Sequence, residues 1–287
     1  GFWGLLSFTM QMCLVVVLGS AFASAPVVKN ILRKIAGIAS SDRSAILLVT
    51  FVSTICCWLN WGFGLIAGAL LAKEIARKVP TVDYRLLIAS AYSGFVIWHA
   101  GLSGSIPLTI TEPTTIGGVT FSVPITQTVF HPMNLIMVGA ILVIMPFLNW
   151  SMHPDKEHTI CVDPALLEDD KEKDYAIKTP ADKLEHSRIL WIITLAMGFV
   201  YLIYYFVQTI QGGDNVFSAL NLNIVNMIFM FLGILAHGDL RRYVDAIGDA
   251  STTAAGVLMQ FPFYAGIMGM MVGTNENGVS LASAISN

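Results

Sequence analysis

The sequence predicts an all-α polytopic membrane protein with about six transmembrane crossings and one re-entrant helical hairpin. Hydrophobic residues make up 55% of the chain and charged residues only 12%, whereas about a quarter of the residues in soluble domains are charged. The apolar residues gather in segments of about 20 residues, the length of a membrane span. With these segments placed as follows, all 16 Lys and Arg residues fall in cytoplasmic loops or helix ends, as the orientation rule requires.

The first expected crossing is Phe2–Ala25, and a basic loop, 27–43, follows it. The hairpin is expected at Ser44–Ala72, a stretch of 29 residues without a charged side chain, with its tip at Asn60–Gly64. One helix of this length would measure about 44 Å, against a hydrocarbon core of about 30 Å. Basic residues flank the stretch on both sides, so both of its ends should lie in the cytoplasm. The alternative is one steeply tilted span, which would put the second basic flank outside.

The crossing after the hairpin, Leu86–Ile110, is apolar at its start but is interrupted by serines and glycines, with Pro107 near its end. Hydrophobic segments broken in this way point to the binding sites of transporters. We therefore expect a broken helix in this crossing. The remaining crossings are expected at Pro132–Trp150, Arg188–Ile210, Leu222–Ala236 and Ala246–Val272.

The loops agree with this orientation. Loop 111–131 has no Lys or Arg and carries one acid, Glu112, as expected for a loop outside the cytoplasm. Segment 151–187 has ten acids and five lysines, including the cluster Glu168–Asp174, and should be a solvated, partly disordered cytoplasmic loop. Within it, Thr179-Pro180 predicts the start of a helix.

Two clusters are candidates for binding a small solute. The first is the hairpin tip, because non-helical backbone inside a bilayer must be satisfied by protein or by a water-filled cavity. The second is the broken helix, where hydroxyls beside unwound backbone suit a carboxylate or a sodium ion. The alternatives are a helix-packing motif for the tip and ordinary serine bonding to the helix backbone for the break. The candidate residues are Asn60, Trp61, Gly62 and Gly64 at the tip, and Ser90, Ser93, Gly94, Ser103, Gly104 and Ser105 at the break.

His99 is the one histidine inside an expected crossing, and an ionisable group at that depth is a functional candidate. A histidine bonded to a neighbouring carbonyl group is the alternative. No Asp, Glu, Lys or Arg falls in the core of an expected span, so coupling to protons would depend on His99, whereas sodium needs only neutral oxygens. We interpret His237-Gly238-Asp239 as a solvated loop end.

Other chemistries find little support. The four cysteines show no metal-ligand spacing, and hydrolase, phosphate-loop and dinucleotide motifs are missing from the sequence. We therefore expect no cofactor, no metal ion and no nucleic-acid partner. A membrane enzyme that modifies a lipid or acyl substrate, with His99 or His131 as its base, would need an acid or nucleophile beside that histidine. That enzyme and a non-transporting membrane subunit remain the alternatives.

The stretches WLNWGFGLIAGALLAKEIARKV at 58–79 and VDYRLLIASAYSGFVIWHAGLSGSIPL at 82–108 closely resemble the bacterial short-chain fatty acid transporter family, the acetoacetate and butyrate uptake type. LLSFTMQMCLVVVLGSAFA at 5–23 and QFPFYAGIMGMM at 260–271 are also similar, so the resemblance covers nearly the whole chain. It implies a multi-pass protein of the bacterial inner membrane that moves a small monocarboxylate with a sodium or proton gradient, is no enzyme, and can form a homodimer.

The resemblance also implies two inverted repeats, each with a re-entrant hairpin and a broken helix. Residues 1–150 would form the first repeat, 151–187 the acidic cytoplasmic loop, and 188–287 the start of a truncated second repeat. Compared with the family, we expect this chain to lack the first span and the end of the second repeat.

Overall fold

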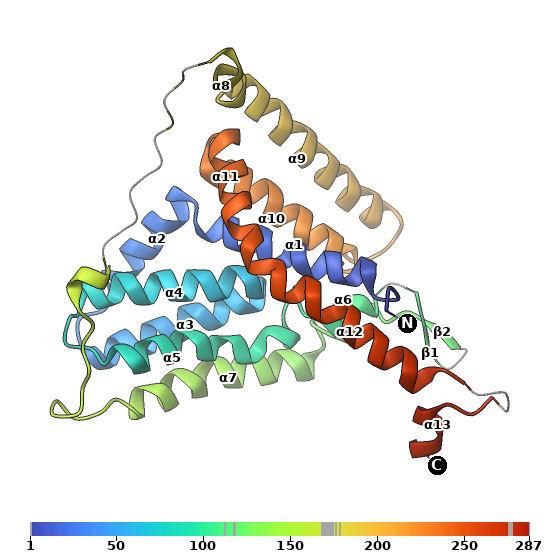
Figure 1. Cartoon of the computed structure of the whole chain (residues 1–287), viewed down its shortest axis with the longest axis horizontal. Coiled ribbons are helices and arrows are strands. Elements are labelled where there is room, and N and C mark those ends of the chain that lie inside the picture. Colours follow the sequence, from blue (N-terminus) through green and yellow to red (C-terminus); the bar gives the residue numbers. More distant parts are fainter. Residues whose placement is uncertain are drawn as a thin grey trace.

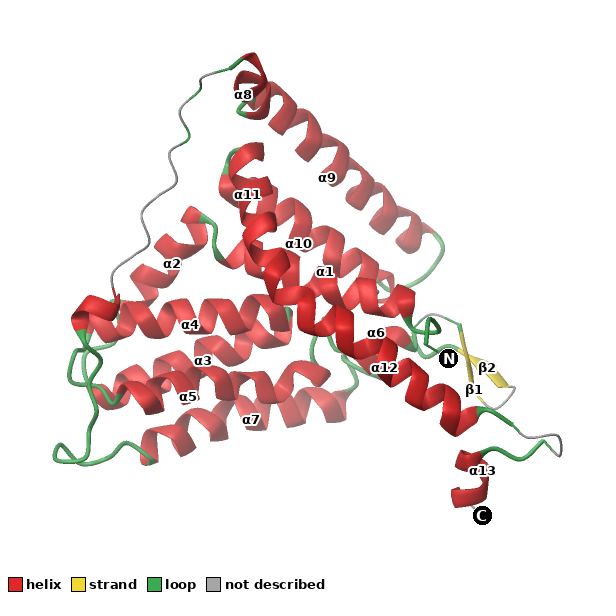
Figure 2. Cartoon of the chain, in the orientation of Figure 1, coloured by secondary structure: helices red, strands yellow, loops and turns green. Residues whose placement is uncertain are grey.

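The computed structural model describes residues 2–111, 113–116, 119–167, 175, 177, 179–274 and 278–286. Helices make up most of the described residues, loops connect them, and two short strands pair with each other (Figure 1, Figure 2). The helices and strands are α1 Leu6–Ala23, α2 Pro26–Ala36, α3 Asp42–Leu59, α4 Trp61–Lys78, α5 Tyr84–Ser93, α6 Ser105–Thr109, β1 Thr114–Ile116, β2 Val119–Phe121, α7 Pro132–Ser151, α8 Pro180–Glu185, α9 Arg188–Gln211, α10 Leu222–His237, α11 Leu240–Ser251, α12 Ala255–Val272 and α13 Leu281–Ser286.

Six helical segments in the described ranges are long and apolar enough to cross a membrane: Leu6–Ala23, Asp42–Leu59, Tyr84–Thr109, Pro132–Ser151, Arg188–Gln211 and Leu240–Val272. The prediction of an all-α polytopic membrane protein is therefore confirmed. The set differs from the expected crossings at two places. One leg of the hairpin, α3, is long enough to be included, and α10 is apolar but shorter.

Helices α3 and α4 form an antiparallel hairpin that turns at Asn60. The pairing is visible in two close approaches, of Gly64 to Cys57 and of Gly68 to Ser53. A capping box in which Ser41 and Ser44 bond reciprocally begins α3, and satisfies backbone N–H groups that the first turn leaves without partners.

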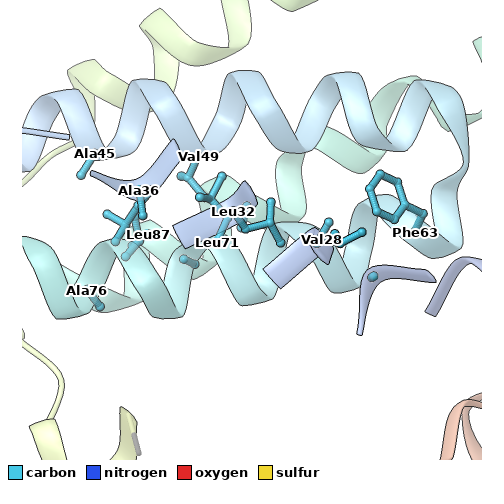
Figure 3. Close-up of a cluster of buried hydrophobic side chains, with 14 of the residues drawn as sticks. Val28, Leu32, Ala36, Ala45, Val49, Phe63, Leu71, Ala76 and Leu87 are labelled. Atoms are coloured by element: carbon cyan, nitrogen blue, oxygen red, sulfur yellow. The ribbon is translucent and has the colours of Figure 1, made fainter. Parts of the chain in front are cut away.

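A continuous apolar core lies between this hairpin, α2 and the first turns of α5 (Figure 3). Leu71 and Leu87 are fully buried in it, and Val28 and Leu32 of α2 close one side. Figure 1 shows α3, α4, α5 and α7 side by side, while α1 packs against α4 on one side and against α10, α11 and α12 on the other. The core thus fixes the hairpin between α1 and the broken helix.

The expected basic loop 27–43 is largely wrong, because Pro26–Ala36 forms α2. Its buried residues Val28, Leu32 and Ala36 are spaced four apart, which is the spacing of one helix face, and Pro26 occupies the first helical position, which proline favours. Arg33 on the outer face pairs with Glu74 of α4, with Nε and Oε2 3.4 Å apart.

Asp83 connects the start of α5 to the loop after α7. Its carboxylate accepts hydrogen bonds from the N–H of Leu86 and of Ile160, both at 2.8 Å, and pairs with Arg85 at 3.3 Å. Burial alone would raise the pKa of Asp83, but these backbone donors and the guanidinium outweigh it and lower the pKa below its ordinary value. The carboxylate is therefore charged at neutral pH and holds the two segments together.

The loops at the other end of the bundle also meet, because the Phe130 and Phe217 rings lie 4.5 Å apart between centroids. The helix start predicted at Thr179-Pro180 is present as α8, with Thr179 as its cap. Glu112 and the acidic cluster Glu168–Asp174 lie outside the described residues.

Candidate functional site

The hairpin turns on a single residue. Asn60 ends α3 and begins α4 in an extended conformation, with φ −155° and ψ 119°, and is completely buried. Its Oδ1 accepts a hydrogen bond from the N–H of Phe63 at 2.9 Å, so the orientation of the amide is fixed and Nδ2 points elsewhere. Asparagine favours this position because its short side chain can cap a helix start.

Two glycines allow the tip to touch its neighbours. A Cβ at Gly62 would lie 2.6 Å from the carbonyl oxygen of Val15 and 2.8 Å from the Cα of Val16, so the tip rests directly on the backbone of α1. A Cβ at Gly64 would lie 2.5 Å from the Cα of Cys57, so the two legs touch there. Both approaches are too close for any residue larger than glycine.

The break after α5 meets the tip. A 3₁₀-helix, Gly94–Ala100, follows α5, and irregular residues separate it from α6. In this break the hydroxyl of Ser103 accepts a hydrogen bond from the N–H of Trp61 at 2.9 Å. Nearby, the N–H of Leu102 donates to the carbonyl of Trp58 at 2.8 Å. The two candidate clusters that the sequence singles out are therefore in direct contact at Trp61 and Ser103.

Two N–H donors at the tip have no partner among the described residues. These are Asn60 Nδ2 and Trp61 Nε1, both shielded from solvent. A buried donor without an acceptor costs about 1–3 kcal/mol, and native structures retain such groups at few places. Because both orphan atoms at the tip are donors, they would match an acceptor such as a carboxylate oxygen. The hydroxyl of Ser90 in α5 is also buried without a partner among the described residues.

Ser93 and Gly94 have structural partners. The hydroxyl of Ser93 donates to the carbonyl of Ser90 and accepts from Asn149 Nδ2 of α7, both at 2.8 Å. Asn149 also donates to Thr50 Oγ1 at 3.1 Å, which links α7 to both α3 and α5. A Cβ at Gly94 would lie 2.6 Å from the backbone nitrogen of Thr54, so this glycine brings the 3₁₀-helix against α3.

His99 is exposed and packs on the neighbouring Trp98, with 3.7 Å between ring centroids. The structure does not bring its imidazole to Asn60 or Ser103. Gly104 is tightly placed, because a Cβ there would lie 2.6 Å from the carbonyl oxygen of His99. Ser105 begins α6 and is buried. In the part of the chain that the structure describes, no three His, Cys, Asp or Glu residues lie close enough to hold a metal ion.

Sequence reasoning missed three residues. A Cβ at Gly19 of α1 would lie 2.6 Å from Asn60 Oδ1, so Gly19 makes room for the tip, and no local pattern marks it. Asn149 was hidden at the end of an apolar crossing. The interpretation of His237 as part of a solvated loop end is wrong, because it is only 8% exposed and its Nε2 lies 2.9 Å from the carbonyl oxygen of Ala21.

The fold and these contacts define a polytopic helical membrane protein in which a helical hairpin meets a broken helix at a buried polar junction. Hairpins and discontinuous helices that meet within the bundle are a feature of secondary transporters. The sequence comparisons identify the family within this class.

The chain belongs to the family described as Short chain fatty acid transporter, which matches residues 1–287. It is 41% identical over 285 residues to a protein of Escherichia coli (strain K12), and 39% identical over 290 residues to one of Haemophilus influenzae. Both carry the name "Putative short-chain fatty acid transporter". The matches cover 97% of this chain and 63% of each relative, so the chain spans less than two thirds of their length. No solved structure matches it.

Proposed function

We propose that the full-length protein carries short monocarboxylates, of the butyrate and acetoacetate kind, across the bacterial inner membrane with an ion gradient. The observation that supports this most directly is the pair of buried donors at the tip, Asn60 Nδ2 and Trp61 Nε1. They could bind the carboxylate at the start of α4, where the positive end of the α4 dipole lies beside the negative end of the α3 dipole, so the donors supply the attraction. The family name, and the names of both relatives, support the substrate class.

In this proposal the hairpin is re-entrant and its tip lies near the middle of the bilayer. The support is the contact of Gly62 with Val15 and Val16, which lie halfway along the membrane-spanning helix α1. Arg43 in the first turn of α3 and Lys78 at the end of α4 would then both face the cytoplasm. The backbone N–H groups of Trp61 and Phe63 have protein acceptors on Ser103 and Asn60, which is what bilayer depth favours.

Two inverted repeats, a homodimer and the absence of enzymatic activity are further parts of the proposal. Neutral oxygens at the break, such as the Ser103 hydroxyl beside Trp61, could bind a coupling sodium ion, and proton coupling would instead require a histidine. Because His99 is exposed, we expect uptake to be insensitive to His99→Gln.

The test is uptake of labelled butyrate by the full-length protein in proteoliposomes, under a sodium gradient and separately under a proton gradient. Asn60→Asp keeps the oxygen that caps α4 but replaces the Nδ2 donor by a negatively charged oxygen. We expect this variant to fold and to lose uptake. The matched control is Asn215→Asp, because Asn215 caps a 3₁₀-helix through its Oδ1, 3.0 Å from the N–H of Phe217, in an exposed loop.

Uptake under either gradient that is lost in Asn60→Asp and kept in Asn215→Asp would support the carrier and its site. If correctly inserted wild-type protein takes up no butyrate under either gradient, the proposed function is wrong. Proton-driven uptake that disappears in His99→Gln would instead make His99 the coupling group.

A further inference from the structure

A cavity of about 670 Å³ lies between α1, α2, α4, α10 and α11, apart from the hairpin tip. Its lining includes Ser20 of α1, Ser24 directly after α1, Lys29 of α2, His237 of α10 and Arg242 of α11. Ile66 of α4 also lines it and lies little more than one helical turn beyond the tip residues. The cavity therefore opens among the basic helix ends and reaches toward the hairpin.

His237 offers the cavity an unoccupied ring nitrogen. The carbonyl of Ala21 can only accept a hydrogen bond, so the Nε2 of His237, at 2.9 Å, must carry the proton. Nδ1 has no hydrogen-bond partner within the described residues, although more than nine tenths of this residue's surface is buried. Nδ1 can accept a hydrogen bond from a molecule in the cavity when it is unprotonated, and can donate one when it is protonated.

Two cations lie beside this histidine. Lys29 and Arg242 are the charged groups that act electrostatically on the His237 ring. Neither forms an ion pair with any residue that the structure describes. The guanidinium of Arg242 instead stacks over the Tyr175 ring, 5.3 Å from its centroid, which leaves its N–H groups available at the edges.

The acids in the lining are better compensated. Asp245 pairs with Arg241 at 3.4 Å, and Arg241 also binds Glu185 at 2.8 Å. Asp249 likewise has an interaction partner. The charges left without an ion pair around His237 are thus positive, and they favour an anion.

We propose that this cavity is a second carboxylate site, on the cytoplasmic side of the hairpin, formed by Lys29, Arg242 and His237. The inference rests on the proposed function for its ligand, a short monocarboxylate. Arg242 and Lys29 bind the carboxylate oxygens, and His237 lies where it can donate to or accept from the same group. The site holds the transported anion between the hairpin tip and the cytoplasm.

The experiment measures butyrate protection of a cysteine placed in the cavity. Ser24→Cys is introduced into the full-length protein after replacement of its exposed cysteines, Cys161 among them. The rate of reaction with a water-soluble maleimide is followed in detergent against butyrate concentration. We expect butyrate to slow labelling. Lys29→Gln and Arg242→Gln should each raise the half-protecting concentration about tenfold, because a charge-assisted hydrogen bond is worth about that factor.

Lys34→Gln is the matched control, because Lys34 is exposed on the same helix and does not line the cavity. It should leave protection unchanged. Asn60→Asp should also leave protection in place, even if it abolishes uptake, since the two sites are separate. Uptake and protection are thus measured independently, and failure of the proposed function is distinguishable from failure of this inference.

Three results would overturn the inference. One is wild-type labelling that butyrate does not slow. Another is protection that Asn60→Asp abolishes but Lys29→Gln and Arg242→Gln leave intact, which would assign the effect to the hairpin tip. The third is labelling blocked by added phosphatidylglycerol and indifferent to butyrate, which would identify the occupant as a lipid headgroup.

Discussion

Gly64→Ala tests whether the two legs of the hairpin touch as closely as the structure has them. The added Cβ would lie 2.5 Å from both the Cα and the Sγ of Cys57, whereas ordinary contact begins at 3.4 Å. The backbone of α4 must therefore move from α3 by about 0.9 Å at this point. Asn60 is four residues away, so the same shift would strain the hydrogen bond between Trp61 and Ser103.

The expected loss of stability is about 1–3 kcal/mol, the usual cost of forcing extra atoms into a packed interior. It is reduced by up to about 1 kcal/mol, because alanine favours a helix more than glycine does. The matched control is Gly139→Ala in α7, where an added Cβ meets nothing within 4 Å. In this control the higher helix propensity of alanine is gained without any steric clash of the new Cβ, so the variant should be as stable as the wild type or slightly more stable.

The assay is thermal unfolding of the purified full-length protein in detergent, together with butyrate uptake by the same samples in proteoliposomes. We expect Gly64→Ala to lower the melting temperature and the uptake rate relative to Gly139→Ala. Equal melting temperatures and equal uptake for the two variants would refute the close approach of the legs, and with it the geometry of the tip.

Asp83→Asn should destabilise the protein by about 1–3 kcal/mol at neutral pH. The carboxylate accepts one backbone hydrogen bond on each of its two oxygens, whereas the amide has a single oxygen to accept them. Since the pKa of Asp83 is lowered in the fold, its stabilisation is present above the unfolded pKa and is lost as pH falls through the folded value. Melting temperatures from pH 7 to pH 3 should therefore fall less steeply in the variant, and parallel curves would contradict this. Asn149→Leu should cost only about 1 kcal/mol, because hydrogen bonds inside membranes average about 0.6 kcal/mol and both hydroxyl partners already donate to their own helices. Thermal unfolding measures this loss, and one above about 3 kcal/mol would show that the network does more than join α7 to its neighbours.

The sequence was most informative where a local pattern had one physical explanation. A charge-free stretch too long for one span, with Asn60 and two glycines at its centre, predicts a helix turning back, and α3 and α4 turn there. A run of serines and glycines in a hydrophobic segment predicts a broken helix, and the helix is irregular between Ala100 and Ser105. In both cases the residues that interrupt the helix lie within a few positions of the interruption itself.

Contacts between distant segments could not be predicted in the same way. The fit of Gly19 against Asn60 depends on how α1 crosses the hairpin, and the burial of His237 depends on α1 and α10 lying together. Neither arrangement leaves a periodic signal in the sequence. Helix α2 was missed for a different reason, because its three basic residues drew attention away from the apolar spacing of Val28 and Leu32.

Because Asn60 caps both α3 and α4, no loop separates the two helices at the apex of the hairpin. At the other end, the hydroxyl of Thr81, three residues beyond the end of α4, donates to the carboxylate of Asp42, the first residue of α3. These two connections, one at each end, oppose separation of α3 from α4. A displacement of the apex would therefore carry both legs with it, and the chain before Ser41 and after Thr81 is where the hairpin joins the rest of the protein.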